Sequence, residues 1–301
     1  MHSWEAIQKT IDYIEEHIDE EIKAEELADV AALSVFYFQR LFARLIKVPV
    51  QEYIKLRRLA LAAGWLRDND GPVWDVAIRY GFNSRETFAR SFKETYGVTP
   101  ANYRDNPIFL HHFDKPDLLL AYVVVDEGMP LVSEGMVLEM SQRSTARPAD
   151  FLGVVGHIPF KFGRMLGERP GINQAGRIFD EFLRVKNDIP SLVDGRIMGV
   201  CYHGDAADGY TTYFAGAEVE LGCRSSRFAH FRLPAREYVI CAFETEGKAE
   251  LADPAVGKAM KYTRFWLRNK GLIADGFFPE MYYPGRQGPT YMELWVPFKK
   301  R

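Results

Sequence analysis

The first hundred residues of this 301-residue chain contain the same pattern twice, fifty positions apart. At this offset several residue identities coincide: Ser34 with Ser84, Phe38 with Phe88, Arg40 with Arg90, Phe42 with Phe92, Val48 with Val98, and Tyr53 with Tyr103. Two copies of so long a period indicate a tandem module, because solenoids need three or more repeats. A single bundle assembled from similar helical hairpins is the alternative explanation.

Each copy has the spacing of two short helices joined at a tight corner. In the second copy, one face of the leading helix carries the apolar residues Val73, Val76, Ala77 and Tyr80. Gly81 can adopt the left-handed conformation that ends this helix. Asn83 or Ser84 can cap the next helix, and Asn83 followed by Glu86 fits a capping box.

The first copy follows the same plan. Residues 25–32 are expected to form its leading helix, and Ser34 is expected to cap a second helix that buries Phe38, Leu41, Phe42 and Leu45. A helix, a tight turn and a second helix make up the helix-turn-helix pattern. In this motif the second helix lies in the major groove of DNA, and its N-terminal residues meet base edges.

Polar side chains occupy the N-terminal turns of both second helices, whereas phenylalanines lie on the opposite face. Arginine can bind guanine bidentately, glutamine can bind adenine, and threonine or an aromatic ring can contact the methyl group of thymine. Residues 34–104 lean basic, although the net charge of the whole chain is −3. A solvated helix face could explain one copy alone, but the repeat and the corner glycine favour DNA recognition.

The rest of the composition argues against several protein classes. Cys201, Cys223 and Cys241 form no C-x-x-C pair, and an odd number of cysteines is a poor disulfide framework. The histidines lack metal-ligand spacing, so neither a metal nor a cofactor is predicted. The longest apolar run, residues 118–125, is too short to span a membrane, and the first ten residues do not resemble a signal peptide. We therefore expect a cytoplasmic protein without a membrane partner.

The periodicity of the chain changes after Asn106-Pro107. Helical patterns precede this dipeptide, and short segments rich in β-branched and aromatic residues follow it, together with helical stretches at 174–187 and 254–270. The sequence therefore predicts two domains. An all-α domain with two helix-turn-helix motifs covers residues 1–107, and an α+β domain covers residues 110–301.

The helical domain has a recognisable sequence. The stretch PVWDVAIRYGFNSRETFARSFKETYGVTPANYR resembles the second helix-turn-helix of AraC/XylS-type transcription regulators. LADVAALSVFYFQRLFARLIKVPVQEYIKLRRLALA resembles the first, together with the rigid helix that connects the two, here residues 50–67. The resemblance covers residues 4–105. It implies binding of double-stranded promoter DNA and activation through RNA polymerase.

By position, the resemblance assigns contacts with bases to seven residues, namely Phe36, Gln39 and Arg40 in the first recognition helix and Arg85, Glu86, Thr87 and Arg90 in the second. Arg40 and Arg90 are expected to contribute most. Glu86 departs from what a DNA contact needs, because its carboxylate repels phosphate and can accept a hydrogen bond only from donors such as cytosine N4.

The second domain resembles the GyrI-like effector-binding domain of multidrug-sensing regulators. The matching segments are FLGVVGHIPF, TTYFAGAEVE, LPAREYVICAFE, FFPEMYYP and TYMELWVPF, with the two helical stretches between them. The resemblance implies a duplicated β-α-β-β fold, with units at about 151–219 and 228–298. A DNA-binding domain placed before a GyrI-like domain is the arrangement of the Rob-type regulators.

The last strands indicate where an effector would bind. In TYMELWVPF, Glu293 lies between two aromatic residues and shares a strand face with Trp295, opposite the apolar core positions. Glu280 and Tyr282 alternate in the same manner in FFPEMYYP. The resemblance places both glutamates in or beside one pocket, with Tyr238 nearby.

Aromatic rings beside a desolvated carboxylate attract a lipophilic cation. A small hydrophobic or cationic effector is therefore predicted. Three alternatives remain open for these residues. They could form an exposed sheet edge with cross-strand aromatic pairs, a hydrolase site in which Glu280 or Glu293 acts as general base, or a module that binds another protein.

Overall fold

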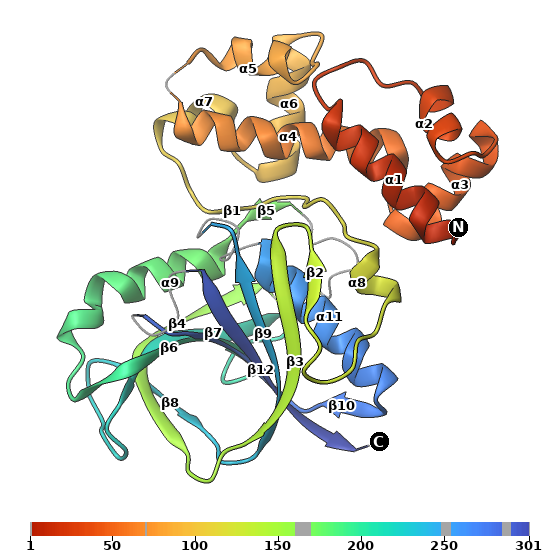
Figure 1. The fold of residues 1–301 in the computed structure, drawn as a ribbon. Coiled ribbons are helices and arrows are strands. Elements are labelled where there is room, and N and C mark those ends of the chain that lie inside the picture. Colours follow the sequence, from red (N-terminus) through yellow and green to blue (C-terminus); the bar gives the residue numbers. More distant parts are fainter. Residues whose placement is uncertain (1, 70, 160–169, 248–253, 285–289, 301) are drawn as a thin grey trace. The chain divides into compact units, whose positions relative to one another are not determined.

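The chain forms two compact units (Figure 1). The computed structural model describes residues 2–69, 71–159, 170–247, 254–284 and 290–300. One unit comprises Met1–Leu118 and Phe162–Asn173, and the other comprises Leu119–Lys161 and Gln174–Arg301. The first unit is helical, whereas the second is built around one large antiparallel sheet.

The helices of the first unit form two lobes. Their bounds are α1 Ser3–Glu16, α2 Ala24–Val30, α3 Val35–Ile46, α4 Val50–Asp68, α5 Val73–Arg79, α6 Arg85–Tyr96 and α7 Pro100–Asp105. Phe38 and Phe42 are buried in the core of one lobe, and Phe88 and Phe92 are buried in the core of the other. α4 contributes to both cores, which confirms the predicted connecting helix. A continuous helix that is buried at both ends holds the lobes at a fixed spacing.

Serine caps begin the second helix of each copy. The Oγ of Ser34 accepts the N–H of Tyr37 at 3.4 Å, and the Oγ of Ser84 accepts the N–H of Thr87 at 3.0 Å. The capping box predicted for Asn83 is therefore not the one used. The helix begins one residue later than that prediction requires.

The corners of the two copies differ by one residue. Each corner has a left-handed residue, Ala32 with φ +54° and Gly81 with φ +70°. Equivalent backbone hydrogen bonds of 2.9 Å close them, from Leu33 to Ala28 and from Phe82 to Ala77. Only the second corner contains an additional residue, Asn83, before its serine cap. The leading helices and corners are therefore offset by 49 positions, and the second helices by 50.

The segment after α7 packs on the helical unit. β1 (Leu110–His111) pairs in an antiparallel manner with β5 (Gly171–Ile172). Phe113 and Leu118 are buried in the first lobe. The compact units therefore divide later than the sequence-based boundary between residues 107 and 110, because apolar side chains beyond Pro107 complete the helical core.

The second unit contains one sheet with two main helices. The elements are α8 Leu119–Tyr122, β2 Leu131–Ser133, β3 Met136–Ser144, β4 Ala149–Pro159, α9 Gln174–Val185, η1 Lys186–Asp188, β6 Leu192–Tyr202, β7 Tyr210–Val219, β8 Ala229–Leu233, β9 Glu237–Thr245, α11 Val256–Asn269, β10 Leu272–Ala274, β11 Phe278–Tyr282 and β12 Tyr291–Lys300. The strand order is β2-β3-β9-β12-β11-β6-β7-β4-β8, with β10 also paired to β12.

The two faces of this curved sheet have different partners (Figure 1). The two helices cover one face, where α9 packs on β4 and β7, and α11 packs on β9, β10 and β12. Leu294 of β12 lies in the core under α11. The opposite face carries a separate apolar cluster that includes Phe151, Tyr238 and Trp295. Side chains that alternate along β12 therefore enter different cores.

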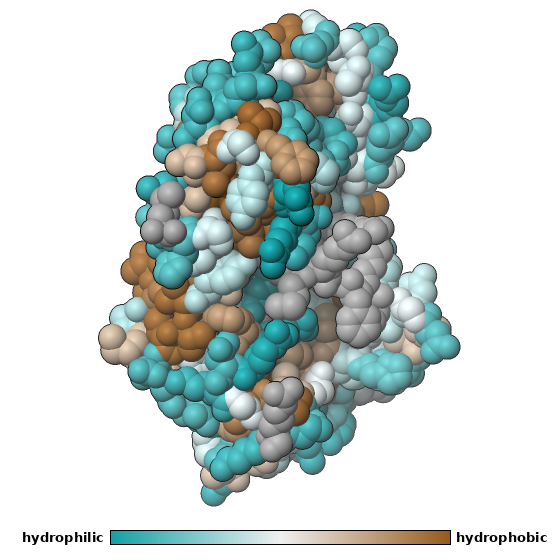
Figure 2. Space-filling model, turned by 90° about the vertical axis from the view of Figure 1, so that its right-hand side faces the viewer, coloured by the Kyte–Doolittle hydropathy of each residue, from teal (hydrophilic) through white to brown (hydrophobic). Residues whose placement is uncertain are grey.

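The surface mixes hydrophilic and hydrophobic residues, as Figure 2 shows for one face. Phe36 and Tyr37 of α3 are among the exposed large apolar side chains. Within the described ranges, no helix has both the length and the apolar character needed to cross a membrane.

Candidate nucleic-acid interface and effector site

The polar side chains of α3 face solvent. Phe36 is 69% exposed, and Gln39 and Arg40 are exposed beside it. The guanidinium carbon of Arg40 lies 5.5 Å from the centre of the Phe36 ring, one turn earlier on the helix. This cation–π contact orients the arginine. Phe38 and Phe42 are fully buried on the other side, so α3 presents a ring, an amide and a guanidinium together.

α6 exposes the corresponding residues of the second copy. Arg85, Glu86, Thr87 and Arg90 are all exposed. The hydroxyl of Ser84 donates to Thr87 Oγ1 at 3.0 Å, so the threonine hydroxyl belongs to the cap and its methyl group remains for apolar contact. Glu86 lies in the first turn, where the helix dipole favours a negative charge.

The exposed arginines of these helices make few intramolecular contacts. Across the described part of the chain, no hydrogen bond or ion pair engages the side chains of Arg40, Arg85 or Arg90. A guanidinium group has five N–H donors in a fixed fork that matches a guanine edge or a phosphate. These three side chains can therefore bind a partner without first breaking an internal ion pair.

Arg58 of α4 links the two lobes. Its Nε donates to the carbonyl of Ile18 at 2.8 Å, and its Nη2 donates to the carbonyl of Glu20 at 2.5 Å. Its Nη1 donates to the carbonyl of Gly81 at 3.5 Å, at the corner of the second copy. Arg58 thus ties the chain that follows α1 to the turn that precedes α6.

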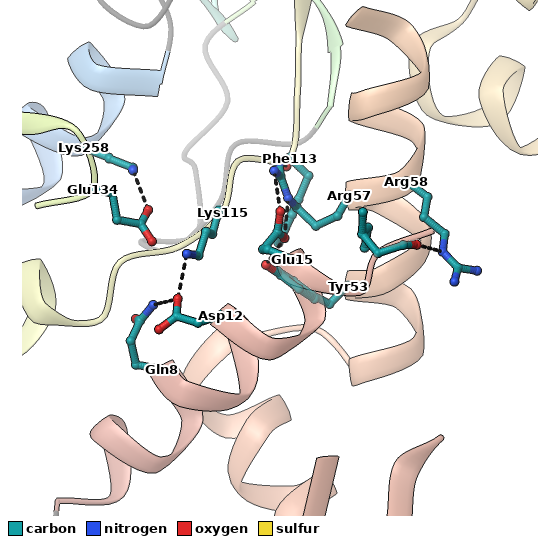
Figure 3. Close-up of polar contacts among 11 residues, drawn as sticks. Gln8, Asp12, Glu15, Tyr53, Arg57, Arg58, Phe113, Lys115, Glu134 and Lys258 are labelled. Carbon is teal, nitrogen blue, oxygen red and sulfur yellow. Dashed lines mark hydrogen bonds and ion pairs between the residues drawn. The ribbon is translucent and has the colours of Figure 1, made fainter. Parts of the chain in front are cut away.

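Arg57 anchors the segment after α7 from the opposite side of α4 (Figure 3). Its Nε and Nη2 donate to Glu15 at 2.8 and 2.9 Å, and its Nη1 donates to the carbonyl of Phe113 at 2.7 Å. Tyr53 also donates to Glu15, at 2.6 Å. Burial alone would lower the pKa of Arg57, but the hydrogen bonds and charge of Glu15 outweigh burial and raise it. Arg57 therefore stays charged.

Glu293 of β12 is 4% exposed and is surrounded by donors. The Tyr291 hydroxyl and the Trp295 indole N–H each donate at 2.7 Å, and the Tyr283 hydroxyl also donates. Arg143 of β3 donates from both Nη atoms, at 3.1 and 3.2 Å. Burial alone would raise the pKa of Glu293, but these hydrogen bonds outweigh burial and lower it. The carboxylate is therefore ionised.

Two of the predicted effector residues lie with Glu293. The rings of Tyr238 and Trp295 are 5.2 Å apart in the cluster on this face of the sheet. The hydroxyl of Tyr238 donates to the carbonyl of Pro234 at 2.6 Å, and burial raises the pKa of Tyr238 to about 12. Tyr238 therefore supports the site through its ring.

The other two predicted residues lie on the opposite face. Met281 pairs in register with Glu293, so its neighbours Glu280 and Tyr282 point toward the helices. Tyr282 contacts Phe179 of α9, with 5.0 Å between ring centres. Glu280 and Tyr282 therefore do not join Glu293 in one site, which corrects the expectation of a single pocket containing both glutamates.

Comparison with known proteins identifies the helical unit. A family model described as a helix-turn-helix domain matches residues 27–106. The regulatory protein SoxS of Salmonella typhimurium is 38% identical over 104 residues, which are 35% of this chain and 97% of SoxS. The chain belongs to the AraC-type helix-turn-helix transcription regulators.

Other relatives of this AraC-type regulator are matched over a smaller share of their own length. The uncharacterized HTH-type transcriptional regulator YbfP of Bacillus subtilis is 42% identical over 104 residues, 35% of each chain. The right origin-binding protein of Escherichia coli is 32% identical over 121 residues, 40% of this chain and 42% of that protein. The match thus spans less than half the length of these two relatives. The AraC-type relatives are regulators and not enzymes.

Solved structures show only weak likeness over the whole chain. The DNA-binding domain of AdpA in complex with a target DNA is 29% identical and covers 33% of this chain and 90% of that chain, with a TM-score of 0.32. The integron cassette protein VCH_CASS2 of Vibrio cholerae is 15% identical and covers 55% of this chain and 100% of that chain, with a TM-score of 0.37.

Arg143 and Tyr283 are contacts of Glu293 that the sequence did not reveal. Arg143 precedes Glu293 by 150 positions, and its strand reaches β12 only through β9. No local pattern contains that pairing. For Tyr283 a signal existed, because alternation in FFPEMYYP turns it away from the face of Tyr282 and toward the face of Glu293.

Proposed function

We propose that this AraC-type regulator binds double-stranded promoter DNA by placing α3 and α6 in successive segments of the major groove. The observation that carries this proposal is the matched design of the two helices. Each begins at a serine cap, buries two phenylalanines and exposes an arginine with polar neighbours. α4 runs between the lobes and sets the separation of the helices.

The chemistry of the exposed side chains suggests their roles. Each arginine can bind a guanine edge, Gln39 can bind adenine, and Glu86 can accept from the amino group of cytosine. The Phe36 ring and the Thr87 methyl group can contact thymine. The assignment to bases thus rests on seven residues, namely Phe36, Gln39, Arg40, Arg85, Glu86, Thr87 and Arg90.

Selection from a random duplex library tests the proposal. The full chain would be incubated with the library, and bound duplexes would be sequenced and footprinted. We expect two enriched blocks separated by about one helical turn, roughly 10 base pairs. A single block would contradict the use of both helices. Failure to enrich any sequence would contradict sequence-specific binding altogether.

We further propose that the regulator works in the cytoplasm and activates transcription by contacting RNA polymerase. This part rests on the family alone. Transcription from a template that carries the selected sequence would be measured with purified polymerase. An increase that depends on the selected sequence would support activation. A decrease would indicate a repressor.

For the second unit, we propose a GyrI-like sensor with a duplicated β-α-β-β fold. Support comes from the element order, in which β4-α9-β6-β7 is followed by β9-α11-β11-β12. The sheet order β9-β12-β11-β6-β7-β4 is also symmetric about the contact of β11 with β6. The proposed effector is small and hydrophobic or cationic, and it binds on the Glu293 face, near Tyr238 and Trp295.

Binding of an effector can alter regulation only if its affinity differs between two states of the protein. The affinity for the selected duplex would therefore be measured with and without each candidate compound. A compound that changes this affinity would support sensing. A compound that binds without changing it would show that the second unit does not signal to the DNA-binding unit.

A further inference from the structure

The side chain of Arg143 occupies the position that a bound cation would take beside Glu293. Its two Nη atoms face the two carboxylate oxygens at 3.1 and 3.2 Å. Its guanidinium carbon lies 5.2 Å from the centre of the Trp295 ring. A carboxylate and an indole face are the two features that attract an organic cation. Arg143 already contacts both the carboxylate and the indole.

The hydrogen bonds of Glu293 leave no room for a further ligand. A carboxylate offers about four lone-pair positions. Arg143 contributes two donors and Tyr283, Tyr291 and Trp295 contribute three neutral ones, so five donors already share these positions. The neutral donors bring no charge, so Arg143 is the contact that compensates the carboxylate. A second cation can approach only if Arg143 leaves.

Arg143 is also the contact most able to leave. Its side chain is 45% exposed, whereas that of Glu293 is 6% exposed. Arg143 lies near the end of β3, and the last residues of that strand are exposed. By contrast, Trp295 is buried in the apolar cluster. Rotation of one long side chain into solvent would thus expose both the carboxylate and the indole.

The nearby Arg196 does not play the same part. Its guanidinium also lies over Trp295, at 5.8 Å, but it is paired with Glu218 at 2.8 and 2.6 Å. Its charge is therefore satisfied by a different carboxylate. Arg196 offers a matched control, because its removal takes away a guanidinium over the same ring and leaves Glu293 paired.

We propose that Arg143 is an internal occupant of a cation site formed by Glu293 and Trp295, and that an organic cation binds there by displacing it. This inference rests on the proposed sensor function and adds a residue that determines its specificity. The cation binds only molecules whose site is open. The apparent association constant of the wild type is therefore the intrinsic constant multiplied by the open fraction. Cations that are too weak to displace the arginine are excluded.

Calorimetric titration with tetraphenylphosphonium tests the proposal, with triphenylphosphine oxide as the neutral comparison. If the site is open in one molecule in ten or fewer, Arg143→Ala binds the cation about tenfold or more tightly than the wild type. The double variant Arg143→Ala/Glu293→Gln loses this gain. Arg196→Ala gains less affinity than Arg143→Ala, because Glu293 keeps its pair with Arg143. Arg143→Gln serves as the second variant if circular dichroism shows that Arg143→Ala is unfolded.

The other outcomes separate the two ideas. Equal affinity of the wild type and both Arg143 variants for the cation overturns the internal-occupant proposal, whereas a sensor site can still exist. Binding of the neutral compound alone also overturns it and indicates an uncharged effector. Lack of binding by every folded variant overturns both this proposal and the proposed sensor role. DNA selection with the full chain remains an independent test of the regulator.

Discussion

The guanidinium of Arg58 lies where a side chain on Gly81 would have to be. A Cβ atom added to Gly81 would lie 2.7 Å from Arg58 Nη1. The same guanidinium holds the carbonyls of Ile18 and Glu20. The corner of the second copy therefore needs glycine for two reasons, the left-handed backbone and the space that Arg58 fills.

The two corners predict opposite effects of exchanging glycine and alanine. Gly81→Ala should destabilise the helical unit by about 2 kcal/mol, because alanine is strained at φ +70° and meets Arg58. Ala32→Gly should stabilise it by about 1 kcal/mol, because Ala32 already carries that strain at φ +54°. Urea unfolding followed by circular dichroism measures both. A loss of stability in Ala32→Gly would contradict the argument from backbone strain.

Arg58 should also affect which DNA is bound. Arg58→Met removes the contacts that connect the two lobes, so the separation of α3 and α6 becomes less fixed. We expect weaker binding to the selected two-block duplex and a smaller additional loss when one base pair is inserted between the blocks. A purely structural role would leave the tolerance for spacing unchanged. Gel-shift titrations with the two duplexes, repeated on Arg104→Met, make this comparison.

The recognition arginines predict a loss of affinity without a loss of folding. Arg40→Ala and Arg90→Ala should each cost about 1–3 kcal/mol of specific binding. Both side chains are exposed, so melting temperatures should stay close to the wild type. Arg104→Ala, which removes the same charge from an arginine paired with Asp105, is the control. If neither recognition variant binds more weakly than this control, the assignment of the helices is wrong.

The ion pair of Glu15 and Arg57 predicts how the segment after α7 is held. Both side chains are largely buried, and Arg57 also binds the carbonyl of Phe113. Glu15→Gln should destabilise the helical unit by about 3 kcal/mol, because the buried guanidinium loses its charge partner. Residues 110–118 should become more sensitive to chymotrypsin, which can cut after Phe113. Unchanged cleavage would show that the apolar contacts of Phe113 and Leu118 suffice.

Local patterns predicted the helical unit well, and long-range pairing limited the rest. The spacing of Phe38 with Phe42 and of Phe88 with Phe92 identifies the buried faces, because a helical face is encoded within a few residues. The pairing of Leu110 with Ile172 and of Arg143 with Glu293 depends on strand register across distant segments. Sequence alternation fixes which face a side chain takes, but not which strand it meets.

Glu293 predicts a specific dependence of stability on pH. Its pKa is lower in the folded protein than in the unfolded chain, where a glutamate titrates at about 4.3. Its contribution is therefore fully present above that pH and is lost as the pH falls through the folded pKa. Glu293→Gln should cost about 1–2 kcal/mol at pH 7, because the buried carboxylate loses charge-assisted hydrogen bonds, whereas the half-exposed Arg143 can be solvated.

The difference in free energy of unfolding between the wild type and Glu293→Gln should shrink on acidification, because protonation removes the same negative charge from the wild type. Midpoints of thermal unfolding between pH 7 and about pH 3.5 measure it. Asp150 provides an internal reference, since hydrogen bonds led by that from Arg232 also lower its pKa. Acid should therefore destabilise the wild type and Glu293→Gln equally through Asp150. A difference that stays constant over the whole range would mean that Glu293 is not the ionised partner of Arg143.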